Sequence, residues 1–254
     1  NPNRVDISEP AEGYTDTDIG YYLELDNYAT SDEDNHYISM DYENATVTDI
    51  NGETRQFVPA EYSIKNDLYS QNQIDFIDKY LNNLFKIVYE ACENGKYYKF
   101  DENYDLVDSD VTTAEEAVSN VMDIDSVRDM YILYEIVHDY DCGEGSFYMC
   151  VDLSKDSKCP KLKFTSPWDF NWAYNDSTEK YYAGAFTDKN FVAKKGDRSN
   201  PWFIILCKQD WFMDAVKEKW TEMSQEKLLQ GCIKTEREYL KEYDADLRKG
   251  EEWG

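Results

Sequence analysis

The sequence predicts an α+β fold that is mostly helical with β-hairpins. Strand-like segments and a hairpin signal occupy the first part of the chain, apolar residues recur at helical spacing from Asn72 onward, and a second hairpin lies between the later helices. Strands and helices that follow one another in blocks are typical of α+β folds. The 254 residues, 41% of them hydrophobic, suffice for one large domain or two small ones. We expect a single domain over 1–254, with a strand-rich first segment at 1–70 and a helical part at 71–254.

The first segment contains the signals of strands and a tight turn. Residues 20–26, GYYLELD, place Tyr, Leu and Leu at alternate positions, which predicts a strand. Within 29–62, a short Asn-Gly pair at 51–52 is a hairpin signal. We therefore expect two further strands joined by a tight turn in this acidic stretch.

The middle of the chain predicts three helices. The first shows apolar residues at helical spacing and ends at Gly95; these residues are Ile74, Ile77, Tyr80, Leu81, Leu84, Phe85 and Val88. Residues 112–122, TTAEEAVSNVM, begin with Thr followed by Glu and predict a short helix. Residues 123–139, DIDSVRDMYILYEIVHD, predict a long and mostly buried helix.

A hairpin and two further helices complete the chain. Residues 146–167 predict a strand, a turn and a second strand, with the sequences SFYMCVDL, SKDSK and CPKLKFTSP. Trp168 and Asp169 follow directly after the second strand. An apolar segment beginning PWFIILC then runs into a helix, and a charged amphipathic helix forms the tail. We expect Trp168 and Trp172 to pack in the core.

None of the six cysteines forms a CxxC pair, which disfavours a zinc site. Cys150 and Cys159 flank the hairpin turn, and they are either free thiols or joined in a disulfide.

The formal net charge of −27 limits the kinds of partner that the protein can bind. It argues against nucleic acid and against an anionic membrane, because both surfaces repel an acidic protein. It suits a secreted or surface-exposed protein, or one that collects cations, and a solvated acidic surface also explains it. No run approaches the ~18 apolar residues of a membrane span. The chain begins at Asn1 without an initiator Met or signal peptide, so it has the form of a mature or excised piece.

Two acidic stretches flank the second hairpin. Asp169 stands between Trp168 and Phe170, where it loses water and stays ionised only if a cation or N–H donors replace that water. A structural cap and a metal ligand both remain open. Before the hairpin, DYDCGEGS at 139–146 holds Asp141, with Ser146 five residues later. A loop carboxylate, a hairpin and a second carboxylate form the layout of a protein-kinase C-lobe, in which one carboxylate grips Mg²⁺ and the other faces the acceptor hydroxyl.

Longer segments extend this pattern, with gaps, from near residue 4 to near residue 225. They are NPNRVDI with IGYYLELDNY, YSIKNDLYSQNQIDFIDKYLNNLFKIVYEA, DIDSVRDMYILYEIVHDYDCGEGSFYMCVD, KLKFTSPWDFNWAYN and PWFIILCKQDWFMDAVKEKW. Together these segments resemble the spore-coat-protein-H (CotH) family of atypical, secretory-pathway-like kinases, and the WDF motif (Trp168–Phe170) and the Asp141 loop are the most specific parts of the match. The resemblance implies an atypical protein-kinase-like C-lobe that transfers the γ-phosphate of ATP to Ser or Thr of a protein substrate, with Mg²⁺.

The resemblance also implies roles for single residues. Asp141 matches the catalytic-loop aspartate, Asp169 the Mg²⁺-binding aspartate, and Ser146 and Asn171 cofactor-binding positions, while Glu135 is structural. In the family, the nucleotide-phosphate lysine and its partner glutamate belong to an N-terminal lobe that precedes the NRV segment. We therefore expect the N-lobe to be largely absent and the chain to belong to a longer, multidomain secreted protein. The implied location is extracellular or at a bacterial cell surface.

Departures from the family pattern leave alternatives open. Asn171 replaces an aspartate and Asn175 replaces a glycine, which favours a weak or inactive pseudokinase that acts as an extracellular binding or structural module. A Ca²⁺-binding acidic domain rests on charge alone, since no D-x-D-x-D-G loop is present. His138 is expected as a packed helix-end residue. Asp139 is either a second acid of the loop or solvated; we expect surface positions for Asp6, Glu24 and Asp26.

Overall fold

The structure, a computed structural model, forms two compact units, Asn1–Met213 and Asp214–Gly254. It describes residues 5, 7–31, 36–43, 45–48, 54–137, 139, 141–173 and 200–243. Strands and helices are both present in the first unit, which confirms the α+β class. None of the helices in the described ranges combines the length and the apolar composition that crossing a bilayer requires.

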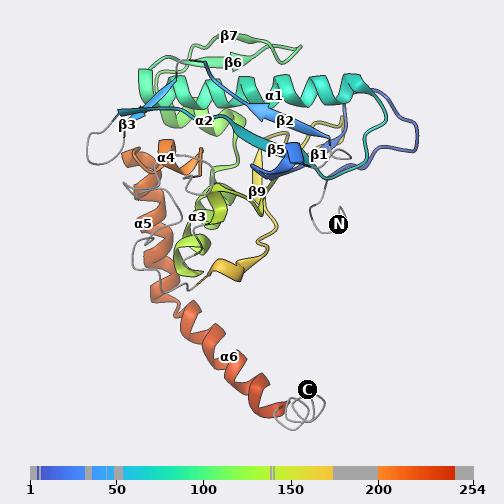
Figure 1. Ribbon diagram of the computed structural model, residues 1–254. Coiled ribbons are helices and arrows are strands. Elements are labelled where there is room, and N and C mark those ends of the chain that lie inside the picture. Colours follow the sequence, from blue (N-terminus) through green and yellow to red (C-terminus); the bar gives the residue numbers. More distant parts are fainter. Residues whose placement is uncertain are drawn as a thin grey trace. The chain divides into compact units, whose positions relative to one another are not determined.

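A five-stranded antiparallel sheet forms the centre of the first unit, and Figure 1 labels four of its strands. The strand order is β2-β5-β1-β8-β9. Its strands are β1 (Gly20–Leu25), β2 (Tyr37–Met40), β5 (Ala60–Ile64), β8 (Phe147–Asp152) and β9 (Lys163–Thr165). The whole of β1 pairs with β8, from Gly20 opposite Asp152 to Leu25 opposite Phe147. The later hairpin therefore joins the strands of the first segment in one sheet, an arrangement that the sequence did not predict.

Two small hairpins accompany the sheet. β3 (Thr46–Thr48) pairs with β4 (Thr54–Gln56), so the hairpin predicted from the Asn-Gly pair is confirmed, while the turn at 49–53 lies outside the described residues. A second hairpin joins β6 (Tyr98–Phe100) and β7 (Leu106–Asp108) and was not predicted. Its rings pack against α1, with the ring centroids of Phe100 and Tyr80 5.1 Å apart.

The helices begin and end where local chemistry places them. They are α1 (Gln71–Tyr89), α2 (Ala114–Val121), α3 (Ile124–Val137), α4 (Phe203–Leu206), α5 (Asp210–Gln225) and α6 (Leu228–Glu242). Ser70 and Gln73 form a reciprocal capping box at the start of α1. A π-helical turn at Glu90–Asn94 follows α1 and ends at Gly95, whose φ of 62° is left-handed. Thr113 caps α2, as predicted.

Both faces of β1 are covered, although its sequence alternates as a one-sided strand does. All six of its residues are buried. Tyr21, Leu23 and Leu25 share one face, and the ring of Tyr21 lies 5.9 Å from that of Phe76 on α1. Tyr22 occupies the opposite face, here called the outer face, where it clusters with Val5 and Cys150. The N-terminal segment therefore covers part of the outer face.

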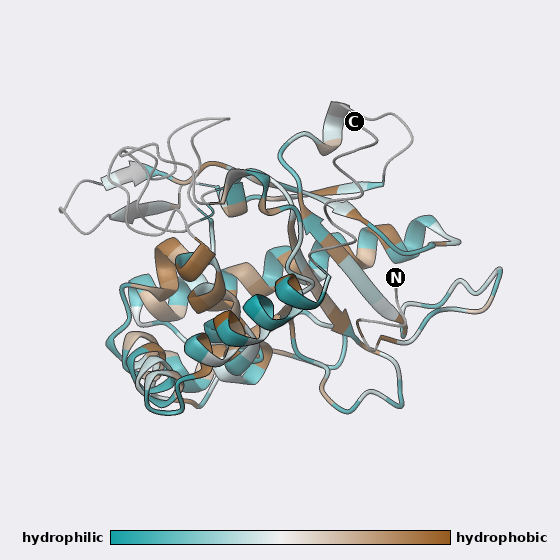
Figure 2. Ribbon diagram, turned by 90° about the horizontal axis from the view of Figure 1, so that it is seen from below, coloured by the Kyte–Doolittle hydropathy of each residue, from teal (hydrophilic) through white to brown (hydrophobic). Residues whose placement is uncertain are grey.

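The core between sheet and helices is rich in aromatic rings. The fully buried Trp202 donates its indole N–H to the Tyr62 hydroxyl at 3.0 Å, and its ring lies 5.4 Å from Phe85. Phe164 of β9 packs against Phe203, at 5.8 Å between centroids. Figure 2 shows the corresponding pattern, with hydrophobic stretches along strands and on one side of several helices. Burial of these large rings supplies much of the stabilisation of the first unit.

All six cysteines are free thiols, so the disulfide left open between Cys150 and Cys159 is not formed. Their environments predict strongly different reactivities. Burial raises the pKa of the Cys92 thiol to about 12, and burial raises the pKa values of the Cys142 and Cys207 thiols as well. Only Cys232 is exposed.

At pH 8 and without denaturant, we expect iodoacetamide to modify Cys232 first. Cys92 should react about 10³-fold more slowly than an ordinary thiol, because its thiolate fraction falls tenfold for each unit by which its pKa rises. Peptide mass spectrometry over a time course measures each rate. Denaturation without reductant should release six reactive thiols, and fewer would contradict the free-thiol assignment.

Candidate active site

A tight turn after α3 carries the first predicted site residue. Asp141 begins a 3₁₀ turn, Asp141–Gly143. The Asp141 carbonyl accepts hydrogen bonds from the N–H groups of Glu144 at 2.8 Å and Gly145 at 3.0 Å. These bonds close the chain on itself directly before β8. The turn therefore fixes the backbone of Asp141 just before the start of β8, at one end of an inner strand of the central sheet.

Asp139 lies beneath this turn and is buried, with 1% of its surface exposed. Its carboxylate accepts the backbone N–H of Asp141 at 3.0 Å. Burial raises the pKa of Asp139, the hydrogen bond from Asp141 opposes that rise, and the negative charge of Asp169 adds to it. Asp139 is thus in electrostatic reach of Asp169 and in direct contact with Asp141. Of the two readings left open for Asp139, the structure favours an acid of the loop and excludes the solvated side chain.

Tyr134 joins the two acidic stretches around one buried ring. Its hydroxyl donates to the carbonyl of Ser146 at 3.4 Å, and its ring lies 5.4 Å from Phe147. On the other side, the same ring lies 5.5 Å from Phe170, the residue after Asp169. Three parts of the chain therefore meet at Tyr134: the end of α3, the start of β8 and the WDF segment, Trp168–Phe170.

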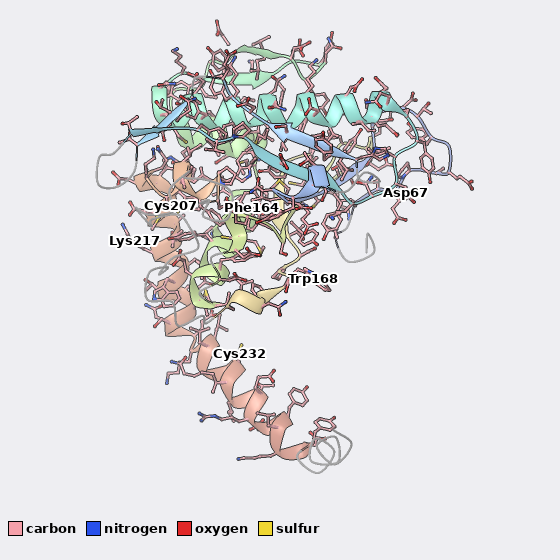
Figure 3. The ribbon with its side chains drawn as sticks, in the orientation of Figure 1. Asp67, Phe164, Trp168, Cys207, Lys217 and Cys232 are labelled. Carbon is pink, nitrogen blue, oxygen red and sulfur yellow. The ribbon has the colours of Figure 1, made fainter. Side chains whose placement is uncertain are left out.

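The WDF segment leaves the core at Asp169. Asp169 is exposed and left-handed, with φ 54° and ψ 60°, and it precedes the 3₁₀ turn Phe170–Trp172. Trp168 is 63% exposed, which contradicts its predicted core position. Figure 3 shows Trp168 projecting away from the ribbon after β9, whereas Phe164 lies inside. The backbone turns left-handed between these rings, and only Phe170, which is half-buried, packs against the buried ring of Tyr134.

Backbone conformation sets this region apart. Within the described ranges, positive φ angles occur at five non-glycine residues, and three of them are Ser146 (54°), Ser166 (51°) and Asp169 (54°). Such conformations cost free energy and tend to gather at functional sites. Ser146 begins the hairpin and Ser166 leaves it, so the strained positions mark both ends of the hairpin.

The remaining predicted residues have more peripheral places. Asn171 is exposed on the turn after Asp169, and His138 lies outside the described residues. Glu135 forms a hydrogen bond with Tyr131 within α3, in keeping with a structural role. No group of three or more His, Cys, Asp or Glu side chains is arranged to hold a metal ion in the part of the chain that the structure describes.

An ion pair on the outer face of the sheet was missed by sequence reasoning. The Glu24 carboxylate on β1 pairs with the Lys65 ammonium just after β5. Glu24 is only 9% exposed, so its expected surface position is wrong. It also accepts hydrogen bonds from the hydroxyls of Ser63, at 3.5 Å, and Tyr148. Only the pairing of β1 with β5 and β8 brings these polar groups together, and no local sequence signal announces it.

The outer-face pair is connected to the WDF segment. The ring of Tyr148 stacks on Tyr22, with centroids 5.4 Å apart. Tyr22 in turn is hydrogen-bonded to Ser166, three residues before Asp169. Contacts thus run without interruption from Lys65 and Glu24, across β8 and β1, to the segment that carries Asp169.

Comparison with known proteins identifies no relative: no family model, no curated protein and no solved structure matches the chain. The α+β class therefore rests on the structure itself. What this site does must be inferred from its residues.

Proposed function

We propose that the chain is a CotH-like protein kinase that uses Mg²⁺ to transfer the γ-phosphate of ATP to Ser or Thr residues of a protein. The observation that carries this proposal is the meeting of the Asp141 turn and the Asp169 segment around Tyr134. Asp139 accepts a hydrogen bond from the backbone of Asp141, and the negative charge of Asp169 raises the pKa of Asp139. Two acidic segments 28 positions apart in the sequence are thereby brought into one neighbourhood.

The residue types suit phosphoryl transfer. Mg²⁺ bound to a nucleotide needs only one or two protein carboxylates, because phosphate oxygens and waters complete its shell. Asp169, exposed at the head of its turn, would hold the ion, with the amide oxygen of Asn171 as a second ligand and Ser146 beside the nucleotide. Asp141 would orient the acceptor hydroxyl and take its proton. A metal cluster of three acidic residues is not required for this chemistry.

The resemblance assigns the phosphate-binding lysine and its partner glutamate to an N-terminal lobe. Lys65 and Glu24 can fill these two roles within the present chain. A lysine paired with a glutamate holds nucleotide phosphates in protein kinases. Here such a pair lies on the outer face, joined through Tyr148 and Tyr22 to the Asp169 segment. We assign phosphate binding to Lys65 and the positioning of its ammonium to Glu24. In a chain of net charge −27, a cationic group and Mg²⁺ must offset the repulsion of ATP.

The test is transfer of labelled phosphate from γ-³²P-ATP, with Mg²⁺, to the chain itself and to a Ser/Thr peptide library. Asp169→Ala should abolish incorporation, because the metal loses its carboxylate. Asp110→Ala is the matched control, since Asp110 is an exposed carboxylate paired with Lys99 beside the small β6–β7 hairpin. Equal incorporation by the Asp169→Ala variant and the unsubstituted chain would refute the metal role.

Lys65→Ala should weaken ATP binding. The loss of one charged contact to phosphate corresponds to an increase of about tenfold in the KM for ATP. Lys79→Ala is its control, because Lys79 on α1 forms an exposed ion pair with Asp105 at 2.7 Å. Initial-rate kinetics over a range of ATP concentrations measure both variants. An unchanged KM in the Lys65→Ala variant would remove Lys65 from the site.

A non-catalytic binding module is the second candidate, favoured by the exposed Asn171 in place of an acid. Binding of Mg²⁺ and ATP without phosphate transfer would identify such a pseudokinase. Following the resemblance, we also propose an extracellular or bacterial cell-surface location, as part of a longer secreted protein, where the protein substrate would be encountered. The net charge of −27 is compatible with such a location.

A further inference from the structure

Two buried asparagines contact the turn that carries Asp141. Asn27, just after β1, is 1% exposed, and Asn200, three residues before α4, is fully buried. They are distant from each other and from the turn in sequence, yet each donates its side-chain amide to a carbonyl of the turn. The acceptors are the carbonyl of Gly143, at 2.9 Å from Asn27, and the carbonyl of Cys142, at 2.8 Å from Asn200.

Asn27 ties the turn to the sheet. Its Oδ1 accepts the backbone N–H of Glu61 on β5 at 3.1 Å, which orients the amide so that Nδ2 faces Gly143. The backbone N–H of Asn27 also donates to the carbonyl of Glu144 at 2.9 Å. One residue therefore fixes β1, β5 and the turn relative to one another.

Asn200 ties the same turn to the start of the α4 region. Its Oδ1 accepts the backbone N–H groups of Trp202 at 3.1 Å and Phe203 at 3.3 Å. These two N–H groups fix the orientation of the amide, so that Nδ2 faces the carbonyl of Cys142. Trp202 and Phe203 are fully buried, so the anchor of this contact belongs to the core.

We propose that Asn27 and Asn200 are positioning residues of the site, which hold the Asp141 turn between the sheet and the α4 region. The proposal rests on the proposed function, because it names what places Asp141 for transfer. Neither side chain reaches solvent, so their amides serve the turn rather than a ligand. Loss of a buried hydrogen bond is costly, so removal of either amide should loosen the turn.

Asn200→Ser isolates this effect. Serine is also a good cap and can still accept the N–H groups that Asn200 accepts, but its side chain is too short to reach Cys142. We expect amide hydrogen exchange in a peptide covering 139–147 to become about tenfold faster, because the free energy of one lost hydrogen bond corresponds to a factor of about this size. The kcat for phosphate transfer should fall about tenfold or more, with the KM for ATP within twofold, because a displaced acceptor group affects the transfer step.

Asn82→Asp is the control. Asn82 on α1 likewise bridges two backbone groups, accepting from Asp41 at 2.9 Å and donating to Ser39 at 3.1 Å, at the far edge strand β2. It should leave exchange at 139–147 and kcat unchanged. Asn27→Ser provides a second variant with the same expected loss at Gly143, should Asn200→Ser fail to fold in thermal unfolding.

Each outcome decides one part of the argument. Faster exchange at 139–147 with an unchanged kcat would overturn the positioning role, and so would unchanged exchange. Absence of phosphate transfer in the unsubstituted chain would refute the proposed function instead. In that case the exchange measurement still decides whether the two asparagines hold the turn.

Discussion

Asp141→Asn should lower the kcat for phosphate transfer by about 10³-fold, the range expected when a group that takes a proton is removed. The amide keeps the size of the side chain but cannot accept the proton of the substrate hydroxyl. The hydrogen bonds that the backbone of Asp141 makes with Asp139, Glu144 and Gly145 do not depend on its side chain. We therefore expect the turn to stay folded and the KM for ATP to change little. Initial rates with γ-labelled ATP provide the measurement.

Asp129→Asn is the matched control for this variant. Asp129 lies in the middle of α3, the helix that precedes the Asp141 turn, where it is exposed and forms an ion pair with Arg128 at 2.8 Å. Its removal should leave the rate unchanged. A loss of less than about tenfold in the Asp141→Asn variant would be too small for a proton acceptor, and the role of Asp141 would have to be abandoned.

Tyr134→Ala should destabilise the first unit by about 3–5 kcal/mol, the range found when a large buried ring is deleted. The ring touches Phe147 of β8 and Phe170 after Asp169, so its loss opens a cavity between α3, the sheet and the WDF segment. The free energy of unfolding in urea measures this change. Phosphate transfer should fall as well at temperatures where the variant is still folded, because the two acidic segments lose their common support.

Tyr134→Phe separates packing from hydrogen bonding. It keeps the ring and removes only the hydroxyl, whose bond to Ser146 is long at 3.4 Å. Burial raises the pKa of Tyr134, so the hydroxyl is neutral at working pH and no charge is lost with it. A cost of less than about 1 kcal/mol is expected. A loss as large as that of Tyr134→Ala would contradict the assignment of stability to the ring.

The sequence predicted the elements well because their signals are local. The spacing of Ile77, Leu81, Leu84 and Val88 predicted α1, and Gly95 marked its end. The Thr113 cap and the Asn-Gly hairpin were equally readable. Each of these signals lies within a few residues of the structure that it specifies.

The sheet and much of the site could not be predicted, because they depend on long-range pairing. Nothing near Glu24 in the sequence indicates that it contacts Lys65 and Tyr148. The alternation of apolar and polar residues in its strand suggested instead that Glu24 lies on a solvent-exposed face. Trp168 and Phe170 have similar local surroundings, yet the left-handed backbone at Asp169 sends one outward and the other inward. Asn27 and Asn200 give no motif, since their partners are backbone carbonyls of a distant turn.

The central place of β1 has a consequence for how this protein is made. Its neighbour β5 follows within 40 residues, but its other neighbour ends at Asp152, opposite Gly20. During synthesis one edge of β1 stays unpaired until residues 147–152 have left the ribosome. A buried, tyrosine- and leucine-rich ribbon with an open edge invites pairing with other nascent chains. Fragments that stop before residue 147 should consequently aggregate, and slow translation before that point would favour misassembly.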